Sequence, residues 1–229
     1  GVPALANDSM AELRTGGLAY VVTEDVSMVE ENLFLSMDEV RVDYVFKNTS
    51  DKDVTSIIAF PMPDIVSQPD SSVAVPDYEA DNFLGFTVTQ DGKPIQPQLQ
   101  QRVSALSIDW TDELHSRKIS VLPYSDKAME DLKTLPPEII RDWVGKGLLH
   151  PDSFDAGQGW QTLYRPLWTL HSVYWWKTTF PAGKTVRVSH RYKPSVGGTV
   201  ALSFIDQGKP GFNYDSYKTR YCLDDAFMK

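Results

Sequence analysis

Cysteine, histidine, basic charge and long apolar runs are all scarce in this chain of 229 residues. It has one cysteine and four histidines. No apolar run approaches the ~18 residues that a membrane-spanning helix needs. Lys and Arg number 22 against 31 Asp and Glu, which gives a formal net charge of -9. This excess of negative charge argues against a phosphate-backbone partner, so we expect no nucleic acid binding. The short apolar runs predict that no transmembrane segment is present.

Motifs of the common catalytic and cofactor sites are also absent. The chain lacks a D-x-D-x-D-G calcium loop, a G-x-S-x-G nucleophile elbow, a Walker loop and a G-x-G-x-x-G turn. No two of its histidines have the i, i+2 or i, i+4 spacing that places two metal ligands on one face: His115, His150, His171 and His190. We therefore expect no cofactor and no metal, and no serine has an identifiable histidine partner.

The apolar content of 41% predicts a globular chain, and its pattern is mostly that of β-strands. Alternating or continuous apolar runs bounded by turn residues mark six segments: 40–48, 54–60, 83–89, 170–180, 185–192 and 200–204. Asp91-Gly92 is typical of a tight turn and predicts a hairpin over 83–103. The turn at 181–184 predicts a second hairpin between the segments on either side of it.

Between residues 104 and 158 the spacing of apolar residues changes from the period of a strand to that of a helix. Ser125 suits a helix N-cap, and Pro136-Pro137 suit the start of a second helix that ends at Gly145. Residues 150–159, rich in Gly, Asp and Pro, are expected to form a loop. Because no βαβ repeat is present, we predict a mainly β fold, an antiparallel β-sandwich with a small helical insertion at about 104–158.

Four of the six tryptophans fall between positions 160 and 176, together with Tyr164 and Tyr174. Aromatic side chains either fill a core or form a recognition surface. Strand parity places Trp176 with Leu170 on the face we expect to be buried. Trp175 shares the other face with His171, and core and recognition surface stay open as alternatives there.

The same strand-parity argument places one histidine on an inward face and another on an outward face. His190 alternates with apolar residues on the inward face of its strand, which predicts a hydrogen-bonded core histidine. His171 lies on the outward face of the preceding strand. It is therefore the better functional candidate of the two.

The first residues predict export. Ala4-Leu5-Ala6 has the small-x-small form that signal peptidase reads before its cut, and polar Asn7 follows. We expect residues 1–6 to be a signal-peptide remnant and 7–229 to form one domain. An exported protein usually pairs its cysteines, so the single Cys222 is either an inert buried thiol or has an unseen partner.

Several short segments of the sequence identify a protein family in combination, although no single one of them does. Those in the first part of the chain are Asn7-Asp8-Ser9, Ala11-Glu12-Leu13, Gly16-Gly17-Leu18, Val40 to Asn48, Lys52-Asp53-Val54 and Ala59 to Pro63. Those in the later part are Phe180 to Lys184, His190 to Gly198 and Tyr221-Cys222. Together they span nearly the whole chain and resemble domain-of-unknown-function family 4424, a family of exported bacterial proteins.

The resemblance implies a β-rich periplasmic or otherwise extracytoplasmic protein with a signal peptide that ends near Ala6. It also implies a longer natural chain, with further C-terminal strands and a second cysteine that pairs with Cys222. The family carries no assigned activity, so no catalytic residue is transferred. Its basic segment from His190 to Gly198 forms a shaped, charged loop, which makes Arg191 and Lys193 candidate ligand contacts.

These features predict a noncatalytic binding or assembly module of the cell envelope, with an envelope protein or a carbohydrate as its partner. The candidate ligand-binding residues are Trp160, Tyr164, Trp168, His171, Trp175, Arg191 and Lys193. The alternative is an envelope hydrolase with a dispersed site, in which His171 or His190 works with a carboxylate.

Overall fold

The structure of the chain, a computed structural model, describes residues 9–14, 17–20, 24–69, 73–195, 205–206, 209–210 and 214–221. The chain divides into two compact units, residues 1–196 and residues 197–229. The expected signal-peptide remnant, the strand expected over 200–204 and Cys222 lie outside the described residues. None of the described helices is long and apolar enough to cross a membrane.

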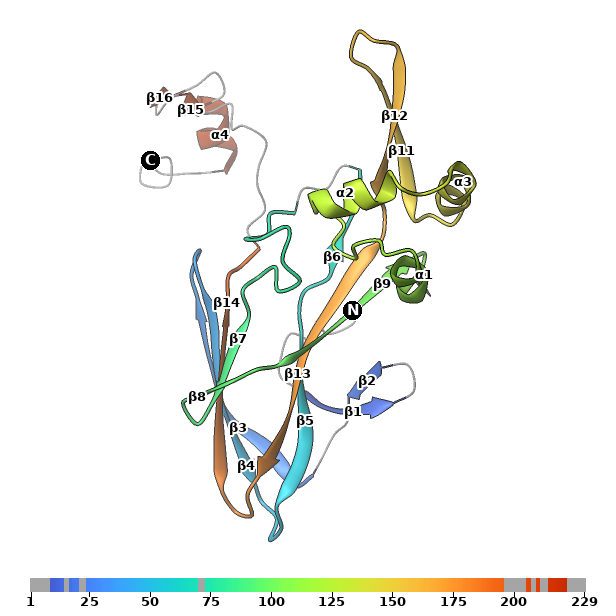
Figure 1. The fold of residues 1–229 in the computed structure, drawn as a ribbon. Helices are drawn as coiled ribbons and strands as arrows, with labels where there is room; N and C mark the ends of the chain where they lie inside the picture. Colours follow the sequence, from blue (N-terminus) through green and yellow to red (C-terminus); the bar gives the residue numbers. More distant parts are fainter. Residues whose placement is uncertain are drawn as a thin grey trace. The chain divides into compact units, whose positions relative to one another are not determined.

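Two large sheets make up most of the first unit (Figure 1). One has the order β10-β9-β13-β5-β1-β2, with β6 beside β13. Its strands are β1 (Ser9–Arg14), β2 (Gly17–Tyr20), β5 (Val54–Pro61), β6 (Ile65–Val66), β9 (Gln98–Ala105), β10 (Ile108–Asp109) and β13 (Thr169–Phe180). The other has the order β3-β4-β14-β7-β8. Its strands are β3 (Val26–Leu35), β4 (Val40–Asn48), β7 (Thr87–Gln90), β8 (Lys93–Ile95) and β14 (Thr185–Tyr192).

Every pairing between described strands is antiparallel. The second unit contains one short strand pair and one helix: β15 (Ile205–Asp206), β16 (Lys209–Pro210) and α4 (Tyr214–Tyr221). The prediction of a mainly β fold with antiparallel sheets and a few short helices is confirmed.

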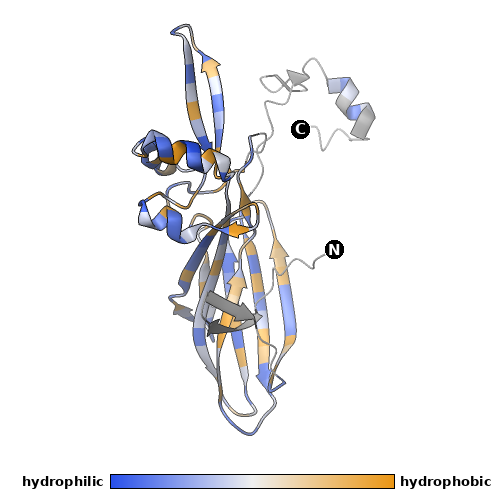
Figure 2. Ribbon diagram, turned by 90° about the vertical axis from the view of Figure 1, so that its right-hand side faces the viewer, coloured by the Kyte–Doolittle hydropathy of each residue, from blue (hydrophilic) through white to orange (hydrophobic). Residues whose placement is uncertain are grey.

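The two large sheets pack against each other because each has one apolar face. Buried and less buried residues alternate along β4 and along β13, as the sequence predicts. The alternating bands of hydropathy along the strands are visible in Figure 2. Ring contacts join the sheets directly, with Phe46 of β4 at 5.9 Å from Phe180 of β13, centroid to centroid. Both sheets therefore share one hydrophobic core.

Strands β13 and β14 belong to different sheets, so the hairpin predicted around residues 181–184 is wrong. β13 pairs with β5 and β9, whereas β14 pairs with β4 and β7. Alternation looks the same for a strand in either sheet, and a Pro-Ala-Gly-Lys turn suits a crossing between sheets as well as a hairpin. Residues 49–53 make a second crossing of this kind, from β4 to β5.

Asn48 joins the two crossings to each other. Its fully buried side chain donates from Nδ2 to the carbonyl oxygens of Phe180 at 2.8 Å and Lys52 at 2.7 Å. Its Oδ1 accepts from the backbone N–H and the hydroxyl of Ser50 at 2.9 and 2.8 Å. The backbone N–H of Asn48 also donates to the carbonyl oxygen of Lys184 at 3.0 Å. One residue thus satisfies polar groups from both connections.

The predicted turn at Asp91-Gly92 is confirmed. Both residues have positive φ, 48° and 77°, and they connect β7 to β8. The hairpin predicted over 83–103 is too long, because its first strand begins only at Thr87 and its second, β8, ends at Ile95 before β9 joins the other sheet. The reason for the late start lies in Asn82, whose side chain bonds both the N–H and the carbonyl oxygen of Phe86 and holds the preceding residues in turns.

The helical insertion lies between β10 and β11. It contains α1 (Thr111–Ser116), α2 (Asp126–Leu132) and α3 (Pro137–Gly145). The last two were predicted, and Ser125 caps α2 by accepting the Ala128 N–H at 3.0 Å. Helix α1 was not predicted, because it has only six residues and its N-cap, Trp110, offers no capping side chain.

The loop expected over 150–159 is instead mostly strand. β11 (Leu149–Asp155) and β12 (Trp160–Pro166) pair in register and form a hairpin that extends beyond the helices (Figure 1). Gly157 and Gly159, with φ of 88° and 89°, make its turn. The Gly, Asp and Pro content marked this turn, but β11 is mostly exposed and lacks the apolar alternation that would identify it as a strand.

We expect the stability of the protein to fall between pH 6.5 and pH 5 because of His190. This side chain is fully buried against Phe60, at 4.1 Å between ring centroids, and near Tyr44, Phe86 and Tyr192, so its predicted place in the core is confirmed. Burial lowers the pKa of His190 to about 3, opposed by the nearby Asp43 carboxylate.

In the unfolded chain the same imidazole takes up a proton near pH 6.5. The unfolded state therefore binds more protons than the folded state in this window, and the free energy of unfolding falls as the pH falls, by up to about 1.4 kcal/mol per pH unit. Urea unfolding at several pH values measures this slope. The variant His190→Phe should show a shallower slope than the wild type, whereas replacement of the exposed His115 by Gln should not. Equal slopes in His190→Phe and wild type would contradict the prediction.

We expect Asn48→Ala to lower the free energy of unfolding by about 2–4 kcal/mol, because it leaves the buried carbonyl of Phe180 and the carbonyl of Lys52 without their donor. Asn32→Ala is the matched control. Its exposed amide donates to the Glu30 carboxylate, so its effect should stay within about 0.5 kcal/mol. Chemical denaturation of the three proteins compares the values, and similar losses in both variants would show that the Asn48 contacts add little.

Candidate functional site

The structure distributes the predicted ligand-binding residues over several places. Trp168 lies in the core with no exposed surface, and its indole Nε1 donates to the carbonyl oxygen of Val121 at 2.8 Å. It therefore cannot contribute to a recognition surface. Trp160 is 80% exposed at the start of β12, next to the hairpin turn, and Tyr164 of the same strand is half-buried against the core.

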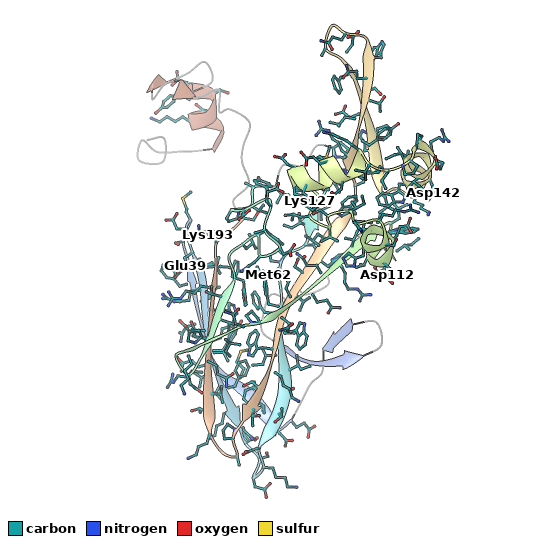
Figure 3. The ribbon with its side chains drawn as sticks, viewed as in Figure 1. Glu39, Met62, Asp112, Lys127, Asp142 and Lys193 are labelled. Atoms are coloured by element: carbon teal, nitrogen blue, oxygen red, sulfur yellow. The ribbon has the colours of Figure 1, made fainter. Side chains whose placement is uncertain are left out.

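Arg191 and Lys193 are exposed at and beyond the end of β14, in the other sheet. An Arg191 guanidinium nitrogen lies 3.9 Å from a Glu39 carboxylate oxygen. In Figure 3, Glu39 and Lys193 lie on one side, and the insertion helices marked by Asp112 and Asp142 lie on the other. The predicted residues thus do not form one site. His171 and Trp175 share the outward face of β13, where both are half-buried.

His171 lies at the centre of a hydrogen-bonded chain of three side chains. Its Nδ1 is 2.7 Å from Oδ1 of Asp64, and its Nε2 is 2.7 Å from Oγ of Ser104. Because an ionised carboxylate only accepts hydrogen bonds, His171 donates from Nδ1 to Asp64. The Nε2 of the neutral ring is then the acceptor for the Ser104 hydroxyl.

The register of three neighbouring strands produces this arrangement. In the ladder between β9 and β13, Ser104 is opposite Thr169 and lies diagonally next to His171. Asp64 precedes β6 by one residue, and Leu170 is opposite Ile65, so continuation of the ladder brings Asp64 beside His171. Each of the three polar residues is next in sequence to an apolar residue that points the opposite way and is buried in the core: Ile65, Val103 and Leu170. All three polar side chains therefore point outward.

A surface hollow of about 430 Å³ adjoins Ser104. Mostly apolar and small residues line this Ser104 hollow: Val66, Ser67, Gln68, Ser104, Ala105, Leu106, Ser107, Gly147, Leu167 and Thr169. Leu106 and Ser107 form the two-residue turn between β9 and β10, with φ of 50° and 64°. A Cβ on Gly147 would lie 3.1 Å from Leu106 Cδ1, so this glycine allows the turn and the end of α3 to approach closely.

A second cavity of about 510 Å³ lies where the base of the β11–β12 hairpin meets α2. The residues that line this binding groove are Ser67, Gln68, Pro69, Pro123, Tyr124, Asp126, Met129, His150, Asp152, Arg165, Pro166 and Leu167. Arg165 donates from Nε to the Asp152 carboxylate at 2.9 Å across the hairpin. The Tyr124 hydroxyl donates to the carbonyl oxygen of Val66 at 2.9 Å, which fixes the ring at the groove wall.

The binding groove and the Ser104 hollow are neighbours, because Ser67, Gln68 and Leu167 line both. Between them they offer a guanidinium, carboxylates, an imidazole, an aromatic ring and a serine hydroxyl. Within the described part of the chain, no three His, Cys, Asp or Glu side chains converge as a metal site would require. The region suits recognition of a polar organic ligand.

Most of these residues could not be identified from the sequence. His171 was singled out by strand parity, but Asp64 and Ser104 are 107 and 67 positions away from it. The available signal was the outward parity of Ser104 and His171 in their own strands, and Asp64 lies before a strand and gave none. Only the pairing of β6 and β9 with β13 shows that the three residues meet.

Gly147 gives a direct test of the wall of the Ser104 hollow. We expect Gly147→Ala to lower the free energy of unfolding by about 1–2 kcal/mol, because the new Cβ meets Leu106 and the backbone has a φ of +71°. Gly145→Ala, with open space at its Cβ, should be neutral or slightly stabilising. Thermal unfolding of both variants makes the comparison, and an unchanged Gly147→Ala would show that the turn adapts without cost.

Comparisons with known proteins place the chain in a family. A family model described as "Domain of unknown function (DUF4424)" matches residues 6–229, so the chain belongs to that family and the resemblance is confirmed. No curated protein matches the sequence. Among solved structures, a candidate nutrient binding protein from Legionella pneumophila is 22% identical, with a TM-score of 0.35 and coverage of 73% of this chain and 39% of that chain. The chain thus spans less than half the length of that protein.

Proposed function

We propose that this DUF4424 protein is a binding or assembly module of the bacterial cell envelope, and that the binding groove holds a carbohydrate without converting it. The observation that carries the proposal is the groove itself. Its volume of about 510 Å³ lies in the range of small-molecule sites, roughly 300–1,000 Å³. An extracytoplasmic location is part of the proposal and is supported by the Ala4-Leu5-Ala6 sequence.

The chemistry of the groove favours a polyhydroxylated ligand. Arg165 supplies several donors in one plane and Asp152 supplies acceptors, and such a pair can bond neighbouring hydroxyl groups of a sugar. Both side chains are about half exposed, so they remain available to a ligand. The Tyr124 ring adds an apolar surface on which a sugar ring can pack.

The same features argue against other small-molecule classes. The wall carries the carboxylates of Asp126 and Asp152 beside a single guanidinium, so a polyanionic ligand such as a nucleotide would meet like charge. A purely apolar ligand would desolvate these groups without replacing their hydrogen bonds to water. A neutral sugar avoids both costs.

Titration with a panel of neutral and acidic oligosaccharides, followed by calorimetry or NMR, tests the proposal. Arg165→Ala should weaken binding of the best oligosaccharide at least tenfold, because a hydrogen bond to a charged group contributes about 1.5–3 kcal/mol. Arg141→Ala, an exposed arginine of α3 outside the groove, should bind as the wild type does.

Binding that is equal in Arg165→Ala and wild type would contradict the assignment of the groove, as would failure of every oligosaccharide in the panel. Fractionation of cells that express the full-length protein tests the location. Recovery in the cytoplasmic fraction would contradict an envelope role.

A further inference from the structure

We propose that Ser104 is the nucleophile of a second site, which hydrolyses esters with a short acyl group. In this site His171 acts as general base and Asp64 orients the imidazole. The proposal does not depend on the ligand of the binding groove, since it rests on the Ser104–His171–Asp64 chain and the adjoining Ser104 hollow. It provides the hydrolase alternative with the nucleophile that the sequence alone did not identify.

The hydrogen bonds place His171 in the form that base catalysis requires. Asp64 holds the proton on Nδ1 at 2.7 Å, which leaves the lone pair of Nε2 directed at the Ser104 hydroxyl at 2.7 Å. A serine hydroxyl is a weak nucleophile unless such a base accepts its proton. Both contacts are within the range expected for nucleophile and base before a substrate binds.

The supporting structure holds these groups in place. Ser104 and His171 are on two adjacent strands of the large sheet, and Asp64 immediately precedes a third. Arg102, directly opposite His171, has its guanidinium engaged by the Asp109 carboxylate. Its charge is therefore partly neutralised rather than free to repel a protonated His171. Sites on strands keep their geometry better than sites on loops.

The Ser104 hollow supplies the remaining parts of an acyl-transfer site. Its apolar wall, formed by Val66, Leu106 and Leu167, suits a short acyl chain next to the nucleophile. Leu106 and Ser107 lie between the paired residues of β9 and β10 and line the same hollow, so we assign their backbone N–H groups as the donors to the oxyanion.

The reaction is an ordinary two-step hydrolysis. Ser104 Oγ adds to the ester carbonyl carbon while its proton moves to Nε2 of His171. The bond to the leaving alcohol breaks, the alcohol takes the proton from Nε2, and the acyl group remains on Ser104. Water then gives a proton to Nε2 and adds to the acyl carbonyl, and the carboxylic acid leaves as the proton returns to Ser104 Oγ. His171 is 37% exposed, so water reaches it for the second step.

A fluorophosphonate probe and p-nitrophenyl acetate, used on the intact chain, test the proposal. We expect an adduct on the peptide that contains Ser104, found by mass spectrometry, and no adduct on that peptide in Ser104→Ala. Hydrolysis of p-nitrophenyl acetate should fall at least 100-fold in Ser104→Ala and in His171→Gln, as removal of a general base or nucleophile does. Ser153→Ala, an exposed serine of β11, should react as the wild type does.

The role of Asp64 is tested by ¹⁵N NMR of the His171 ring, which shows the ring nitrogen that carries the proton. The wild type should show the proton on Nδ1, and Asp64→Asn should reduce both this population and the hydrolysis rate, with part of each restored in Asp64→Glu. Far-UV circular dichroism confirms that each variant is folded. A wild type without an adduct on Ser104, an adduct formed equally in His171→Gln, or a wild-type proton on Nε2 would each overturn the proposal.

Discussion

The hydrogen bonds of Asn48 are the constraint on which the sandwich depends. The chain passes between the two sheets after β4 and again after β13, and each passage must bury backbone polar groups at the edge of the core. The Asn48 amide satisfies carbonyl groups from both passages, at Lys52 and at Phe180. Because it is bonded to both, it fixes where β5 begins relative to the end of β13. These two strands pair from Val54 opposite Phe180 onward, so the ladder starts at the residue that Asn48 holds.

The aromatic core extends that constraint to the rest of both sheets. Phe180 contacts Phe46 near the crossings, and farther along the sandwich the ring of Phe60 in one sheet lies 4.1 Å from that of His190 in the other, centroid to centroid and tilted by 47°. A neutral imidazole fits this place, since burial keeps the pKa of His190 low and the ring packs as an aromatic. The inward-facing side chains of both sheets therefore serve to pack the core. Functional groups must lie on the outward faces or in the insertion, and this is where the candidate sites are found.

The sequence predicts the fold more completely than the sites, for a physical reason. Burial on one side of a strand leaves an alternation that can be read locally, as in β4 and β13, and caps or turn dipeptides such as Ser125 and Asp91-Gly92 act over a few residues. Which sheet a strand joins leaves no such local trace, and for this reason the hairpin predicted around 181–184 is wrong. The same limit applies to function. Strand parity identified His171 as outward-facing but could not show which outward residues of β9 and β6 meet it.

The two candidate sites follow from where the insertion joins the sheet. The first sheet gains β6 and β10 at the end where the helices and the β11–β12 hairpin begin, so strand register and inserted elements determine one surface together. The sheet supplies rigid positions for Ser104 and His171, whereas the hairpin and α2 supply the walls of the binding groove. The Ser67-Gln68 segment and Leu167 border both cavities. Changes to the insertion can therefore alter the groove while the pairing of β6 and β9 with β13 still brings Asp64, Ser104 and His171 together.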